Sequence, residues 1–177
     1  FKNDAFGTSD FEAVKDLTGS FAATSYLKGE NRGYSIANAK VKRDGVRQGE
    51  KESTAYSSQN EAYALVLNAE DWVKYLVDAP ETDDYSLSLT VGKSSKGCVF
   101  EIIIDNQTII KSEIPEDLEF GTQSYVNVNA GSFHVEKGVH SLKIRVFDGT
   151  LDVLNLSTSK NATALGQVTD SLRDKDS

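Results

Sequence analysis

The chain has 177 residues, of which 38% are hydrophobic, enough for one ordinary core but too few for two full domains. Its 27 acidic and 19 basic residues give a formal net charge of -8, with no basic stripe, which argues against nucleic acid and anionic membrane surfaces as partners. No apolar run is long enough to cross a bilayer, and we expect any signal peptide to have been removed or to lie upstream of Phe1.

The first 33 residues mix weakly spaced apolar side chains, such as Phe11, Val14 and Leu17, with Gly, Ser and Asn. Three interpretations stay open for this segment: a short helix, an added strand, or the edge of a neighbouring domain. We therefore treat residues 1–33 as an N-terminal extension and expect the main domain to follow it.

Strand patterns dominate the middle of the chain. Residues 85–91 (YSLSLTV) and 140–147 (HSLKIRVF) alternate apolar and polar side chains, the period of two expected of a strand with one buried face. Residues 99–114 predict a hairpin, because its polar tip at residues 105–107 tolerates turn dihedrals between two β-branched runs. Further strands are expected at residues 62–67, 72–77, 125–128 and 151–156.

Short strands at this spacing, broken by loops such as AGS (130–132) and DGT (148–150), are typical of an all-β protein built as an antiparallel sandwich or barrel. Residues 159–177 carry few large hydrophobic groups and read as a polar tail or linker. The single Cys98 has no partner for an internal disulfide, and we expect a buried structural cysteine rather than a nucleophile.

The most specific motif in residues 34–158 is NAEDWVKYLVDAPETDDYSLSLTVGKSS (68–95). It resembles the Gly-Asp-Trp-Val-Glu-Tyr strand, Pro-containing turn and alternating strand of carbohydrate-binding modules of families 6 and 35. The segments VFEIIIDNQTII, QSYVNV, AGSFHVEKGVHSLKIRVF and GTLDVLNLS then follow in the family's order. The resemblance implies a galactose-binding-like jelly roll, an antiparallel two-sheet β-sandwich.

The resemblance also implies a function. It predicts a non-catalytic carbohydrate-binding module, covalently linked to the catalytic domain of a larger polysaccharide-degrading enzyme and found outside the cell or on its surface. The acidic balance of the chain disfavours polyanionic glycans, so a neutral oligo- or polysaccharide is the expected partner.

Family members often hold calcium through two glutamates in an opening segment, since carboxylate oxygens suit this cation. If YSIANA is that segment here, Ser35 and Ala37 stand in those positions, and only Asp152 of the closing strand remains as a carboxylate. Placing the motif on FEAV instead gives Glu12 followed by Val14. We therefore predict no metal site of the family type and no cofactor.

The sugar cleft of this family pairs two aromatic rings across a pyranose and adds an asparagine. In this chain Val66, Thr122 and Thr150 occupy the three positions, so all three groups are replaced. Either the register shifts in these loops, or the site has moved, or the module no longer binds sugar; the last alternative makes it a structural or protein-interaction sandwich.

Several other side chains remain candidates for sugar contact. Trp72 is either a stacking platform or a ring covered by a terminal segment, and Tyr125 is expected to pack inward. Tyr56 and Tyr63 flank the polar loop SSQNE and are the better candidates for exposed rings, with Asp148 and Thr150 of the DGT loop near them. The predicted ligand-binding set is Tyr56, Tyr63, Trp72, Thr122, Asp148 and Thr150.

Patterns typical of enzymes are weak. His134 and His140 are too few for a zinc cluster, and no Gly-x-Ser-x-Gly, phosphate-loop or Cys-x-x-Cys motif occurs. Paired acids such as Asp83-Asp84 fall in expected turns, where solvated charge explains them without a glycosidase site. The sequence therefore predicts no catalytic residue.

Overall fold

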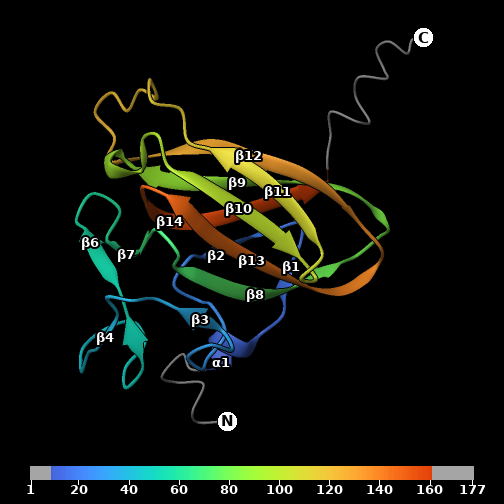
Figure 1. Cartoon of the computed structure of the whole chain (residues 1–177), viewed down its shortest axis with the longest axis horizontal. Helices are drawn as coiled ribbons and strands as arrows, with labels where there is room; N and C mark the ends of the chain where they lie inside the picture. Colours follow the sequence, from blue (N-terminus) through green and yellow to red (C-terminus); the bar gives the residue numbers. More distant parts are fainter. Residues whose placement is uncertain (1–8, 161–177) are drawn as a thin grey trace.

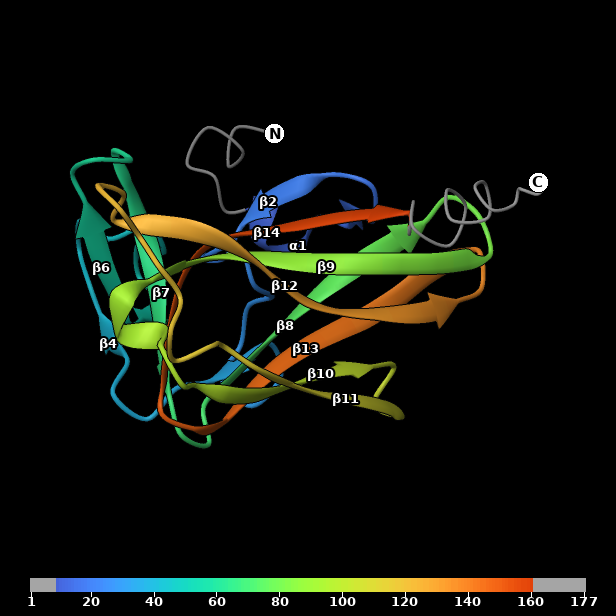
Figure 2. The same ribbon diagram turned by 90° about the horizontal axis from the view of Figure 1, so that it is seen from above.

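The computed structural model describes residues 9–160, which form an antiparallel β-sandwich of two large sheets (Figures 1 and 2). Sheet A contains β1 (Lys15–Asp16), β3 (Tyr34–Ser35), β8 (Trp72–Ala79), β10 (Val99–Ile104), β11 (Thr108–Glu113) and β13 (Gly138–Asp148). Sheet B contains β2 (Ser20–Ala22), β6 (Thr54–Ser57), β7 (Ala62–Asn68), β9 (Asp83–Gly92), β12 (Tyr125–Val135) and β14 (Thr150–Lys160). The predicted all-β, two-sheet fold is confirmed.

The two sheets have simple strand orders. Sheet A runs β1-β8-β13-β10-β11 with β3 also beside β8, and sheet B runs β12-β9-β14-β7-β6 with β2 beside β14. A small third sheet joins β4 (Lys40–Val41) to β5 (Lys51–Glu52), and two short helical turns, α1 (Ser9–Glu12) and η2 (Lys93–Ser95), complete the elements. Figure 2 shows β9, β12 and β14 in one layer and β10, β11 and β13 in the other.

The core forms where the alternating strands face each other. Every second residue of β9, from Tyr85 to Val91, is fully buried, and the same holds for Leu142, Ile144 and Val146 of β13. Both alternations were predicted from sequence. Cys98 is also fully buried, as predicted, and burial raises the pKa of its thiol to about 12.

Residues 9–33 contribute to both sheets. Within them the structure has the short helix α1 and the two strands β1 and β2, paired with β8 and β14. Leu17 and Tyr26 lie in the core between the sheets. The sandwich expected to begin at residue 34 therefore includes residues before it, because the apolar side chains of this segment pack inside the sandwich.

The chain near residue 130 differs from expectation. The AGS segment was predicted as a loop, but it lies inside β12, which pairs with β9 from Tyr125 to Val135. A β-bulge between Asn129 and Gly131 absorbs one extra residue, and Gly131 takes a φ of 147°, which favours glycine. The predicted DGT turn is confirmed between β13 and β14. Strand β14 extends to Lys160, so it includes the first two residues of the expected tail, which begins at residue 159. The rest of that tail, from residue 161 onward, lies outside the described residues.

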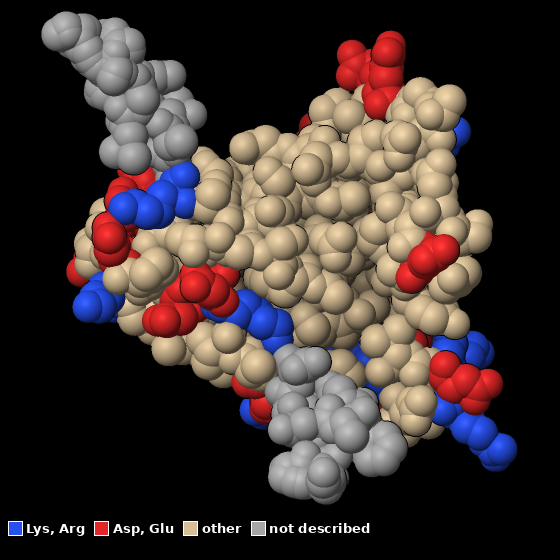
Figure 3. All heavy atoms as spheres, turned by 180° about the vertical axis from the view of Figure 1, so that it is seen from behind, with Lys and Arg blue, Asp and Glu red and all other residues tan. Residues whose placement is uncertain are grey.

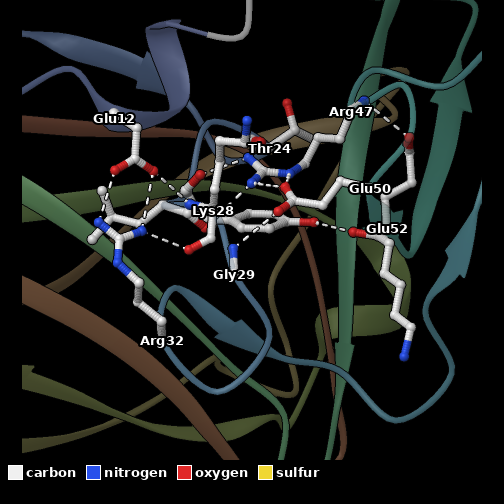
Figure 4. Close-up of polar contacts among 11 residues, drawn as sticks. Glu12, Thr24, Lys28, Gly29, Arg32, Arg47, Glu50 and Glu52 are labelled. Atoms are coloured by element: carbon white, nitrogen blue, oxygen red, sulfur yellow. Dashed lines mark hydrogen bonds and ion pairs between the residues drawn. The ribbon is translucent and has the colours of Figure 1, made fainter.

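A buried arginine fixes the N-terminal segment to the β4–β5 hairpin (Figure 4). The side chain of Arg47 has no exposed surface, and its guanidinium carbon lies 3.8 Å from the Phe11 ring centroid and 3.7 Å from that of Tyr26. Its N–H groups donate to the Thr24, Tyr26 and Leu27 carbonyls and to Glu50. These five hydrogen bonds use all five donors of the guanidinium.

We expect Arg47→Met to destabilise the protein strongly, because it removes the donor to Glu50 Oε1 and to three carbonyls. Breaking one side of a buried ion pair costs about 3–5 kcal/mol. Urea unfolding measures the difference. Arg43→Met at an exposed position four residues away is the control and should change stability by less than about 0.5 kcal/mol. Equal unfolding midpoints for the two variants would show that the buried cation contributes little.

Candidate functional site

A cleft of about 380 Å³ opens at the end of the sandwich where β9 ends and β12 begins. It is lined by residues 92–94 at the end of β9, by residues 121–125, which lead into β12, and by Asp152 of β14. The volume lies within the range of small-ligand pockets, about 300–1,000 Å³. The cleft is thus large enough for a small sugar.

Tyr125 and Asp152 form the floor of this cleft. The Tyr125 hydroxyl donates to Asp152 Oδ1 at 2.8 Å. Burial raises the pKa of the Asp152 carboxyl, although hydrogen bonds from Tyr125 and Ser94 act in the opposite direction. Burial also raises the pKa of the Tyr125 hydroxyl, so this group stays protonated and remains a donor at neutral pH.

Backbone features hold the floor in position. Ser95 Oγ donates to the Asp152 carbonyl at 3.1 Å and accepts from the Asp152 N–H at 2.8 Å, which ties η2 to β14. A Cβ at Gly92 would lie 2.7 Å from Asp152 Oδ2 and 3.1 Å from Tyr125 Cε2. Glycine at position 92 therefore leaves the space that the carboxylate and the ring occupy.

The β6–β7 hairpin braces the outer wall of the cleft. Gln59 Nε2 donates to the Thr122 carbonyl at 3.0 Å, and Gln59 Oε1 accepts from the Ser124 N–H at 2.6 Å. A single amide side chain thus satisfies both a donor and an acceptor of the loop before β12. The loop is held by a strand pair that is distant in sequence.

Two exposed tyrosines lie on the same hairpin. Tyr56 and Tyr63 are cross-strand partners whose ring centroids are 5.0 Å apart with the planes at 62°, and their exposures are 57% and 39%. Tyr63 also borders a hollow of about 360 Å³ formed with residues 42–45. The prediction that these two rings are exposed is confirmed; their role in binding remains a prediction.

Trp72 lies on a different surface. It is half-buried on the outer face of sheet A, where Lys143 Nζ sits 4.3 Å from the ring centroid. Among the described residues, Lys143 of the neighbouring strand β13 lies over this ring. Burial, followed by the charges of Lys74 and Arg145, lowers the pKa of Lys143.

The remaining predicted contact residues are dispersed. Thr122 lines the cleft, and Val66 is the strand partner of Asp152 beside it. Asp148 is exposed at the turn before β14, and Thr150 Oγ1 donates to Asn68 Oδ1 at 2.9 Å. The structure therefore brings Thr122 to the cleft but leaves Trp72 on the other sheet and Asp148 at the turn.

The residues that build the cleft floor were not among the predicted sugar contacts. Tyr125 was expected to pack inward, but it is half-buried and borders the cleft. Asp152 was considered only as a calcium ligand. The sequence carried one signal for these two residues, since each is a polar or amphipathic side chain near the start of a predicted strand. The proximity of Tyr125 to Asp152, however, depends on how β9, β12 and β14 align.

No three His, Cys, Asp or Glu side chains within residues 9–160 come together as a metal-binding group. Glu12, one candidate calcium ligand, instead pairs with Arg32 at 2.8 Å. The expected absence of a family-type calcium site remains a prediction. Across the described part of the chain, no helix has the length and apolar character needed to span a membrane.

Comparison with known proteins gives results only at the level of structure: no family model matches the sequence, and no curated protein matches it. CsCBM6-3 from Clostridium stercorarium, solved with cellobiose, has a TM-score of 0.57 at 11% identity, over 84% of this chain and 98% of its own. The fold is that of family 6 carbohydrate-binding modules.

Two further structures show how widely this fold occurs. CBM6cm-2 from Cellvibrio mixtus lichenase 5A, solved with cellotriose, gives a TM-score of 0.54 at 13% identity, covering 80% of this chain and 97% of its own. A ruminal GH26 endo-β-1,4-mannanase gives 0.51 at 14% identity, over 84% of this chain but only 27% of the enzyme. At such identities the comparisons establish the fold alone.

Asp152 generates a pH-dependent prediction. Its folded-state pKa is raised, so the unfolded chain holds fewer protons and the stability contribution of this group falls as pH rises through the acid range. We expect Asp152→Asn to raise the melting temperature, relative to the unchanged protein, by a few degrees more at pH 7 than at pH 3. Asp148→Asn in the exposed turn is the control, and thermal melts at both pH values decide the outcome. An Asp152→Asn shift that does not depend on pH would contradict the proposed burial of the charge.

Proposed function

We propose that this chain is a non-catalytic module that binds a neutral glycan in the cleft formed by Tyr125, Asp152 and the loop before β12. The observation that carries the proposal is the pairing of one aromatic ring with a fixed carboxylate in a hollow of sugar size. An aromatic face matches the apolar C–H face of a pyranose, while the carboxylate accepts hydrogen bonds from sugar hydroxyls.

The groups around this pair suit a polyhydroxylated ligand. Ser94, Thr122 and Gln123 also border the cleft, and each side chain has both donor and acceptor capacity. Lys93 is the only cation among the lining residues of this cleft, which also include the carboxylate of Asp152. This lining supports a neutral ligand better than an anionic one.

The fold supports the same proposal by analogy. Structures of this fold have been solved with cellobiose and with cellotriose, and others form part of longer chains that include a mannanase. We propose that this module is likewise attached to a polysaccharide-degrading catalytic domain and acts outside the cell or on its surface. The net charge of -8 supports the exclusion of nucleic acid as a partner.

Among the residues predicted from sequence, Thr122 belongs to this proposed site. Tyr56 and Tyr63 are proposed as an additional contact surface, because Gln59 of the same hairpin is bonded to the cleft loop. Trp72, Asp148 and Thr150, the other contacts predicted from sequence, do not line the cleft and are not part of this proposed site.

A glycan array with the whole chain identifies a ligand, and titration calorimetry then tests the site. We expect Tyr125→Ala to weaken binding at least tenfold, a loss of about 1.4 kcal/mol, because the stacking ring is removed. Tyr125→Phe keeps the ring and should lose less. Trp72→Ala, on the other sheet, should leave affinity within twofold. Loss of binding in Trp72→Ala but not in Tyr125→Ala would place the site on the outer face of sheet A instead.

A further inference from the structure

Three turns lie at the end of the sandwich opposite the cleft. They are residues 80–82 between β8 and β9, residues 105–107 between β10 and β11, and residues 136–137 between β12 and β13 (Figures 1 and 2). The cleft lies at the other end, because its lining includes Gly92, which ends β9, and Tyr125, which begins β12. The contacts among these turns therefore belong to a part of the molecule that the proposed function does not use.

His140 of β13 connects two of the three turns. Its Nδ1 lies 2.6 Å from Asp105 Oδ2, and its Nε2 lies 2.6 Å from the Glu136 carbonyl oxygen. The His140 side chain is only 13% exposed, so the protein rather than water supplies these partners. The third turn is joined separately, by the Lys137 N–H, which donates to Thr82 Oγ1 at 2.8 Å.

The two partners determine the protonation of the His140 ring. An ionised carboxylate and a backbone carbonyl can only accept hydrogen bonds, so both ring nitrogens must donate. A neutral imidazole has a single N–H, whereas the imidazolium has two. The two contacts at 2.6 Å therefore assign the charged form to His140 in this structure.

Asp105 is held in the position that this contact requires. Its Oδ1 accepts from the Ser141 N–H at 3.0 Å, and its backbone N–H donates to the Ser141 carbonyl at 3.0 Å. The turn itself is closed by the Gln107 N–H, which donates to the Ile104 carbonyl at 2.9 Å. None of these three bonds involves the imidazole, so the Asp105 carboxylate keeps its place when the ring changes charge.

The charges around His140 favour the imidazolium. Figure 3 shows both acidic and basic side chains at this end of the molecule, on the left of that view. The nearest titratable side chains on β8 and on the two turns are Asp78, Asp105, Glu136 and Lys137. Partial burial alone lowers the pKa of His140, but its hydrogen bonds to Asp105 and Glu136, and the charges of both residues, raise it by more. Asp78 points to the outer face of sheet A, because it is exposed next to the buried Val77 that pairs with His140.

Loss of one proton breaks one of the two contacts. A neutral ring that keeps the proton on Nδ1 still bonds to Asp105, but its Nε2 lone pair then faces the lone pairs of the Glu136 carbonyl. Hydrogen bonds to an ionised acceptor are roughly twice as strong as those between neutral groups, so the bond to the carboxylate is the one retained. The Glu136 carbonyl then turns to water, and the turn at residues 136–137 loosens.

We propose that His140 is a pH-dependent clasp, which holds the turn at residues 136–137 against the turn at residues 105–107 and releases it when the ring loses its second proton. The stabilisation is fully present below about pH 6.5, the ordinary pKa of histidine, and is lost as the pH rises through the raised pKa of the folded protein. The clasp is independent of glycan binding, since the cleft lies at the other end of the sandwich.

Amide hydrogen exchange of the whole chain, followed by NMR, tests the clasp. The Lys137 N–H is the reporter, because its bond to Thr82 depends on the position of the turn, and the Ser141 N–H is the reference. Rates are corrected for the intrinsic pH dependence of exchange. Between about pH 6 and about pH 8.5 we expect the protection of Lys137 to fall about fivefold or more, and that of Ser141 to stay within about twofold.

Three variants assign this response to the ring. His140→Gln removes the titrating group and should make Lys137 protection independent of pH within about twofold. His134→Gln is the matched control, because His134 also bonds to an aspartate at 2.7 Å but is 59% exposed, and it should keep the full response. Asp105→Asn repeats the test in case His140→Gln fails to fold. It removes a charge that favours the imidazolium, so the loss of Lys137 protection should begin at lower pH.

Three results overturn the proposal. Equal Lys137 protection at both pH values in the unchanged protein means that the ring does not control the turn. A fall that persists in full in His140→Gln means that another group is responsible. A long-range proton–nitrogen spectrum that shows only one protonated ring nitrogen on His140 at about pH 6 contradicts the assignment of the imidazolium.

Discussion

The buried guanidinium of Arg47 is the interaction on which the arrangement of this end of the molecule depends. It lies between two aromatic rings and bonds to three carbonyls of residues 24–27, so it fixes the N-terminal segment to the β4–β5 hairpin. The backbone N–H of Arg47 donates to the carboxylate of Glu52, a buried residue two positions before β6 begins. The base of the β6–β7 hairpin is therefore held by the same network.

The tip of that hairpin extends this order to the candidate site. Gln59 bonds to the loop before β12, which forms one wall of the cleft, while Tyr125 and Asp152 form its floor. Hydrogen bonds at the base and at the tip of the hairpin thus connect the Arg47 network to the wall of the cleft. A binding site built on preformed elements loses less conformational entropy when a ligand binds than a site built on mobile loops does.

The sequence was sufficient to predict the sandwich because most strands have one buried face. The alternation of apolar and polar residues was enough to predict β9 and β13, and the polar tip at Asp105 was enough to predict the β10–β11 hairpin. The order of the motifs along the chain predicted the type of fold. Residues 9–33 were harder, since β1 and β2 are two and three residues long and carry no periodicity. The bulge at Gly131 was read as a loop because a glycine followed by a serine also suits a turn.

The site was less predictable than the fold. Arg47 lies in a polar stretch that gives no indication of burial, because the rings and carbonyls that stabilise it come from residues 11–27. Tyr125 and Asp152 become neighbours only through the alignment of β12 and β14 on either side of β9. Sequence spacing alone carries no information about such cross-strand neighbours, so the exposed tyrosines were easier to identify than the cleft floor.

The central claim is that a glycan binds at the loop end of the sandwich rather than on the outer face of sheet A. Two-dimensional amide NMR of the labelled chain, titrated with a disaccharide that it binds, tests this most directly. The account predicts the largest shift changes at Gly92, Ser94 and Tyr125. Changes centred on Trp72 and Lys143, with none at the cleft, would contradict it.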